Sequence, residues 1–278
     1  MPKVRKLLNF SEGATEVKIK RALKGMPYRV LPAVSLSETL EIDRNLLSPE
    51  QFDYALKTSF DIVVIHEDTT PIFAVEYDGP VHSRNRKIKN DRLKAEICEI
   101  CEFPLLRIDD NLLHANILGQ DLIDWLVNLY FLCEEFYAMQ ERGEISQEEP
   151  WYFGSLIDYN PFVKFRGAVH IWHQKGFVYD PLPHHMIIKT EDNCYYAISA
   201  FEVKKGHWVI GETKCRASLF PAITSSELSE ELSMVAAFIK IKQFIEGHSI
   251  KTISTDELKV RLAELRPKMV LCGGRAIP

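Results

Sequence analysis

Two short apolar runs bordered by acidic residues constrain the fold of this chain more than any other feature. Residues 62–65 are all β-branched, which predicts a buried strand. A turn-forming segment follows, and a second apolar run, residues 72–75, ends at Glu76 and Asp78. If the two strands pair as a hairpin, Asp61 at the start of the first strand joins the two acids at the end of the second.

These three carboxylates predict a metal site. Side chains alternate along a strand, so Glu76 and Asp78 project from one face, ~7 Å apart. Together with Asp61 they offer hard oxygen ligands, which hold Mg²⁺ or Mn²⁺. The alternative is that the acids simply end two strands in water. We favour the metal site, because like charges gathered without an obvious cationic partner destabilise a fold unless a cation binds there.

The elements around this hairpin predict a mixed α/β architecture. Helical spacing of apolar residues marks the helices, and one of them begins with a Ser48 cap followed by Pro49. The order is typical of a sheet flanked by helices. We expect a helix at 11–24, a strand at 28–36, a short helix after Ser48, the two strands of the hairpin, a helix at 85–102, a strand at 104–108 and a helix at 121–142.

A polar, acidic segment with both Gly143 and Pro150 predicts a domain boundary at 141–150. We expect a first domain at 1–145 and a second at 151–278. Aromatic residues and frequent turns over 151–222 predict short strands, and two helices follow, so the second domain is expected to be α+β, with no role assigned. Several of its aromatic residues are expected in the core rather than in a base-stacking platform. They are Trp151, Tyr152, Phe153 and Trp172.

The distribution of charge bears on the partner. A net charge of −5 argues weakly against nucleic acid. Basic residues nonetheless gather in residues 1–30 and 84–94, and a basic surface beside an acidic site suits a polyphosphate substrate. The alternative is that these runs are solvated helix faces. The expected nucleic-acid-binding residues are Arg84, Arg86, Lys87, Lys89 and Arg92.

The sequence also bounds the compartment. No apolar run approaches the ~20 residues that a membrane span needs. The basic N-terminus lacks the apolar core and cleavage site of a signal peptide. Six scattered cysteines give no disulfide framework. We therefore expect a cytoplasmic protein with no membrane partner, and the oligomeric state stays open, a dimer included.

Residues 60–64 and 74–82 together resemble the PD-(D/E)XK nuclease superfamily. They are most similar to its very-short-patch-repair-like branch and related families of unknown function, in which an Asp strand is followed by Glu-x-Asp-Gly and a nearby His. Residues 91–94 and 103–107 resemble the helix-to-strand passage of the same proteins. The resemblance covers about residues 10–125. It implies a restriction-endonuclease-like mixed sheet flanked by helices, and a nuclease that uses Mg²⁺ or Mn²⁺.

The resemblance also implies roles for single residues. Asp61 takes the place of the metal-binding Asp, although Phe60 stands where the name-giving Pro would be. Glu76 takes the second acidic place. Asp78 departs from the pattern, because it stands where the familiar version has Lys. Glu16, on the first helix, matches an additional acid that some members contribute, and the competing choice is Glu12.

A cation must replace the one that Asp78 displaces, and the candidates are His82, Lys87 and Lys94. We favour Lys94 as the charge-stabilising residue and His82 as the proton-handling one. The expected function is an endonuclease that cleaves DNA, of the repair, restriction or defence type. The alternative is a catalytically inactive nuclease-fold module that binds nucleic acid or a protein partner.

Overall fold

The computed structural model describes residues 8–79, 85–117, 119–156 and 160–274. The chain divides into two compact units, and each is described by itself. The first unit contains residues 1–151 together with 218–222, and the second contains residues 152–217 and 223–278. No helix of the described ranges is long and apolar enough to cross a membrane.

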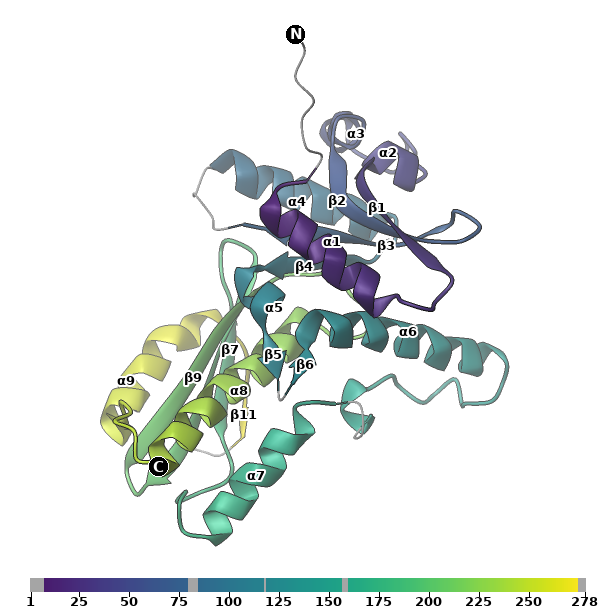
Figure 1. Cartoon of the computed structure of the whole chain (residues 1–278). Coiled ribbons are helices and arrows are strands. Elements are labelled where there is room, and N and C mark those ends of the chain that lie inside the picture. Colours follow the sequence, from purple (N-terminus) through teal and green to yellow (C-terminus); the bar gives the residue numbers. More distant parts are fainter. Residues whose placement is uncertain (1–7, 80–84, 118, 157–159, 275–278) are drawn as a thin grey trace. The chain divides into compact units, whose positions relative to one another are not determined.

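The first unit contains a mixed four-stranded sheet (Figure 1). In spatial order its strands are β1 (Tyr28–Ser35), β2 (Ser59–His66), β3 (Pro71–Asp78) and β4 (Leu105–Asp109). β2 pairs antiparallel with β1 and β3, which confirms the predicted hairpin, and β3 pairs parallel with β4. A parallel pair needs a crossover, and the helix α4 (Asn85–Ile100) provides it.

Side-chain caps explain where the helices begin. Ser48 and Gln51 form the predicted capping box of α3 (Pro49–Ala55), with Pro49 at the first helical position. The helix α1 (Phe10–Ala22) begins earlier than predicted, because the side chain of Asn9 caps it in a box with Glu12. The unit's further described elements are α2 (Leu36–Thr39), α5 (Asp110–His114), β5 (Asn116–Ile117), β6 (Gln120–Asp121) and α6 (Leu122–Glu141).

Both faces of this sheet are covered by helices (Figure 1). On one face, Phe60, Ala74 and Leu105 pack in a buried cluster with apolar residues of α2, α3 and α4. On the other face, Phe73 of β3 packs against Tyr130 and Phe131 of α6, with ring centroids 4.9 and 6.4 Å apart. The mixed α/β architecture expected from the sequence is confirmed.

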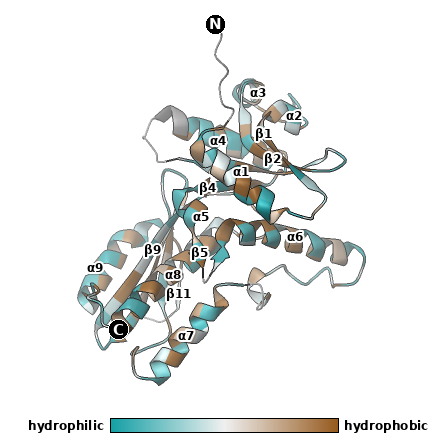
Figure 2. Ribbon diagram, viewed as in Figure 1, coloured by the Kyte–Doolittle hydropathy of each residue, from teal (hydrophilic) through white to brown (hydrophobic). Residues whose placement is uncertain are grey.

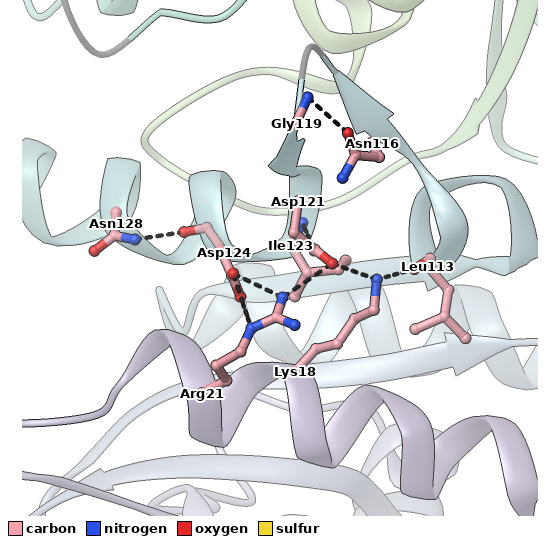
Figure 3. Close-up of polar contacts among 9 residues, drawn as sticks. All are labelled: Lys18, Arg21, Leu113, Asn116, Gly119, Asp121, Ile123, Asp124 and Asn128. Carbon is pink, nitrogen blue, oxygen red and sulfur yellow. Dashed lines mark hydrogen bonds and ion pairs between the residues drawn. The ribbon is translucent and has the colours of Figure 1, made fainter.

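Ion pairs join α1 to the start of α6 (Figure 3). The ammonium of Lys18 lies 2.6 Å from Asp121 and also donates to the carbonyl of Leu113. The guanidinium of Arg21 lies 3.0 Å from Asp121 and 2.7 Å from Asp124. Two members of the N-terminal basic cluster therefore neutralise acids inside the unit.

Residues 218–222, here called the return segment, complete the first unit from a distant part of the sequence. Leu219 forms an antiparallel bridge with Leu105 of β4. Phe220 packs against Phe73 and Tyr130, with ring centroids 5.8 and 5.2 Å away. The second edge of β4 is thereby covered, a contact that the sequence did not predict.

The second unit contains an antiparallel five-stranded sheet with helices on both faces. In spatial order the strands are β10 (Ile253–Ser254), β9 (His207–Arg216), β8 (Cys194–Lys204), β7 (His184–Lys189) and β11 (Met269–Gly274). The helix α8 (Ser225–Ile245) crosses β9 so closely that a Cβ on Gly211 would lie 2.0 Å from the carbonyl oxygen of Ser233. On the opposite face, α9 (Thr255–Leu265) contributes Leu258 and Leu262 to a buried cluster.

One part of the second unit contradicts the prediction of short strands over 151–222. Residues Val163–Gln174 form the helix α7. Phe165, Val169 and Trp172 recur at helical spacing and form its packed side, a period that the many aromatic residues obscured. Short 3₁₀ turns lie at Phe153–Ser155 and Arg266–Lys268.

Candidate functional site

The carboxylates of Asp61 and Glu76 lie side by side at the point where β2 and β3 separate. The register of the two strands runs as far as the pair Ile62 and Val75. At the next position the backbone N–H of Asp61 donates to Oε1 of Glu76 (3.2 Å), and the backbone N–H of Tyr77 donates to Oδ2 of Asp61 (2.8 Å). Side-chain oxygens thus replace ladder carbonyls, which fixes both carboxylates side by side.

Lys94 of α4 contacts this pair of acids. Its ammonium lies 2.6 Å from Oε1 of Glu76, donates to the carbonyl of Ser59 (2.9 Å) and lies 5.5 Å from the ring centroid of Phe60. Lys94 and Glu76 are only 6% and 8% exposed, so their attraction is little screened by water. Lys94, the cation that we favoured from the sequence, therefore lies beside Glu76.

Asp78 has a different partner, which the sequence analysis missed. Arg107 of β4 holds Asp78 in a bidentate pair, with Nε–Oδ2 and Nη2–Oδ1 distances of 2.7 and 2.8 Å. Its Nη2 also lies 3.1 Å from Asp91 of α4. The available signal was an arginine inside an otherwise apolar strand, since a buried arginine requires carboxylate partners.

The expected cluster of three metal-binding carboxylates is therefore not formed. Both oxygens of Asp78 face the Arg107 guanidinium. Over the described residues, no group of three or more histidine, cysteine, aspartate or glutamate side chains is arranged to hold a metal ion. Asp78 instead acts as the buried counter-ion of Arg107.

The remaining charge of the site is negative. Two cations, Lys94 and Arg107, contact or face a larger set of carboxyls. Burial raises the pKa of Glu76 to about 7, although the charge of Lys94 opposes this. Burial also raises the pKa of Asp61, against the hydrogen bond from the Tyr77 N–H, and the pKa of Asp109, which lies opposite Asp78 in the parallel register. The carboxyls of the set are Asp61, Glu76, Asp78, Asp91 and Asp109.

Asp61 and Glu76 fit a divalent cation. Within the described part of the chain, hydrogen bonds engage Oδ2 of Asp61 and Oε1 of Glu76, which leaves Oδ1 and Oε2 for a ligand. Mg²⁺ is commonly bound through one or two carboxylates, with waters and substrate phosphate completing its shell. The negative excess of the site and its two raised carboxyl pKa values favour such an ion.

Of the two acids considered on α1, Glu12 is the one coupled to the site. Its charge raises the pKa of Asp61. Glu16, which the resemblance suggested, instead pairs with Lys20 on its own helix at 2.7 Å. The position of Glu12 in the capping box of α1 holds its carboxylate at the helix start.

The predicted phosphate-binding residues are found in three situations. Lys89 pairs with Glu50 of α3, and Arg92 lies 2.6 Å from Glu96, so both already have acidic partners. Arg86 and Lys87 belong to α4, but their side chains lie outside the described residues, as do His82 and Arg84 altogether. For Lys89 and Arg92 the structure favours the alternative of a solvated, ion-paired helix face.

Comparison with known proteins gives one finding. Residues 4–119 match a family model described as a protein of unknown function (DUF2726). This range contains Asp61, Glu76, Lys94 and Arg107 but less than half of the chain. Neither the curated proteins nor the solved structures contain a match.

Proposed function

We propose that the first unit is a metal-dependent nuclease with a restriction-endonuclease-like fold. The observation that carries the proposal is the contact of three groups. Half-buried Asp61 lies beside buried Glu76 where β2 and β3 separate, and buried Lys94 touches Glu76. The antiparallel hairpin, the α4 crossover and the parallel β4 support the fold. DNA is the proposed substrate, through the sequence resemblance.

Asp61 and Glu76 would hold Mg²⁺ or Mn²⁺. Such an ion acidifies a water and polarises a phosphoryl oxygen, which is the chemistry that phosphodiester hydrolysis needs. Lys94 adds a fixed positive charge that stabilises the extra negative charge on the phosphate as it is attacked. Because its ammonium is buried, that stabilisation is stronger than in open water.

Arg107 positions this machinery without touching the reacting atoms. It joins Asp78 at the end of β3 to Asp91 on α4. Asp91 lies three residues before Lys94, so the two project from neighbouring positions of one helix. The network therefore holds α4, and with it Lys94, against the strand that carries Glu76.

Two further parts of the proposal rest on sequence. His82 remains the predicted proton donor, and it lies outside the described residues. A cytoplasmic role of the repair, restriction or defence type follows from the resemblance and from the cysteines, all six of which are free thiols. One observation favours an inactive binding module instead, because the acid at the family's usual Lys position is fully engaged by Arg107.

A cleavage assay separates the two. The full chain is incubated with plasmid and with single-stranded DNA in Mg²⁺, Mn²⁺ or EDTA, and Asp61→Asn is compared with Asp53→Asn, the same change at an exposed residue of α3. Melting temperature with and without Mn²⁺ reports ion binding independently of cleavage. We expect Asp61→Asn to lose both cleavage and the Mn²⁺ shift while Asp53→Asn keeps them. Cleavage by Asp61→Asn at the wild-type rate contradicts the metal assignment, and a wild-type chain that never cleaves supports the binding module.

A further inference from the structure

The helix α7 carries both hydrophobic and hydrophilic residues along its length (Figure 2), and one side of it is used in packing. Phe165 and Trp172 meet Phe238 of α8, with ring centroids 4.5 and 4.6 Å apart, and Val169 between them is 2% exposed. Trp172 is half-buried in this packing, whereas Tyr152, which was also expected in the core, is 54% exposed. The apolar side of α7 is occupied within the second unit.

A flank of α7, about 105° round the helix from the packed side, is basic and exposed. Lys164, Ile171 and Lys175 follow each other at seven and four residues, which places them within about 20° of one line along the helix. The two lysines lie ~16 Å apart on this line. Among the described residues, no carboxylate pairs with either lysine, whereas Arg166 pairs with the buried Glu231. Residues 159–179 contain neither Asp nor Glu.

The loop that follows α7 presents two exposed aromatic rings. Phe177 and Tyr179 are 46% and 47% exposed, while Val178 between them is 2% exposed. The backbone N–H groups of Tyr179 and Asp180 both donate to the carbonyl of Glu202 on β8, at 3.0 and 3.1 Å. The loop is thus anchored from inside, and both rings face outward.

We propose that the surface formed by Lys164, Ile171, Lys175, Phe177 and Tyr179, here called the α7 surface, binds single-stranded nucleic acid. Aromatic faces stack on unpaired bases, and lysines contact the phosphates between them. Asp180, the nearest acid in sequence, accepts a hydrogen bond from the Leu182 N–H at 2.8 Å and so caps the following turn.

Two other partners fit the α7 surface less well. A duplex hides the faces of its bases, so the exposed rings gain nothing from it. A membrane-surface helix buries its apolar side in lipid, and the apolar side of α7 is already packed on α8. The proposal goes beyond the metal chemistry of the first unit and does not depend on it.

Binding without cleavage tests this proposal. The full Asp61→Asn chain in EDTA is titrated into a labelled oligothymidylate, and binding is followed by fluorescence anisotropy. A length of about 16 nucleotides matches the number of nucleotides that a single-strand-binding domain covers. We expect Phe177→Leu with Tyr179→Leu, which keeps apolar area but removes the rings, to weaken binding ~10-fold or more. The double variant Lys164→Gln with Lys175→Gln should reduce the slope of the logarithm of the binding constant against the logarithm of the salt concentration. The expected reduction is roughly 1.4, or 0.7 for each lost phosphate contact.

Matched controls are Tyr137→Leu on α6, which is also 46% exposed, and Lys259→Gln on α9. Both should leave affinity and salt slope unchanged. Unchanged affinity in the double leucine variant overturns the proposal, as does equal affinity for duplex, or binding to phosphatidylserine vesicles without binding to the oligonucleotide. Because no metal is present, these outcomes are independent of whether the first unit cleaves DNA.

Discussion

Replacing Glu76 with Gln separates the electrostatic cost of this carboxylate from its packing. Burial raises the pKa of Glu76 to about 7 from an ordinary value of 4.5. The folded chain therefore binds this proton more tightly than the unfolded chain, so the free energy of unfolding falls as the pH rises from 4.5 to 7. A difference of 2.5 pKa units corresponds to about 3 kcal/mol, present in full below pH 4.5 and lost above pH 7. Gln keeps an acceptor for Lys94 and for the Asp61 N–H but does not titrate.

Urea unfolding between pH 4.5 and 8, without divalent ions, measures this difference. We expect the difference in free energy of unfolding between wild type and Glu76→Gln to change by about 3 kcal/mol over this pH range, because the wild type loses stability faster as the pH rises. Glu231, whose pKa burial also raises to about 7, adds a similar slope in the second unit, so Glu231→Gln is the matched control. At saturating Mn²⁺, the difference in free energy of unfolding between wild type and Glu76→Gln should no longer depend on pH. The difference between wild type and Glu231→Gln should still depend on it. Parallel curves for wild type and Glu76→Gln without metal would refute the reasoning.

Two further predictions follow from the partners of the buried acids. Lys94→Gln should lower the cleavage rate ~10²-fold or more while the Mn²⁺-induced shift in melting temperature persists, and a rate within twofold of wild type contradicts its role. Arg107→Met leaves Asp78 and Asp91 without their buried cation and should lower the free energy of unfolding by about 3–5 kcal/mol. Urea unfolding measures this loss, with Arg92→Met, a change at an exposed arginine of α4, as the control. Equal losses of unfolding free energy in the two variants contradict the structural role of Arg107.

What the sequence predicted correctly is local. The hairpin of β2 and β3 follows from two β-branched runs around a turn, and the start of α3 follows from the Ser48 capping box. Both signals depend on neighbouring residues. The approach of Lys94 to the site was also expected, because the acids at the end of the sheet attract a cation from the following helix.

The missed features depend on residues far apart in the chain. Arg107 meets Asp78 only because β3 and β4 pair in parallel register, which the sequence of either strand alone does not specify. Asp78 was therefore expected to bind metal, when a cation 29 residues away neutralises it. The strand prediction failed at α7 because aromatic residues are common in strands, and their helical spacing carried the better signal.

The return segment has a consequence for how the chain is made. Leu219 and Phe220 reach β4 and Phe73 only after residues 152–217 have been synthesised. At typical translation rates the interval from Trp151 to Ala222 lasts roughly 4 to 14 seconds. Throughout it, the nascent sheet keeps one edge of β4 unpaired, and unpaired edges recruit other chains. The sequence that encodes most of the second unit thus sets how long the first unit stays vulnerable on the ribosome, and a shortened gene ending at residue 151 would make that vulnerability permanent.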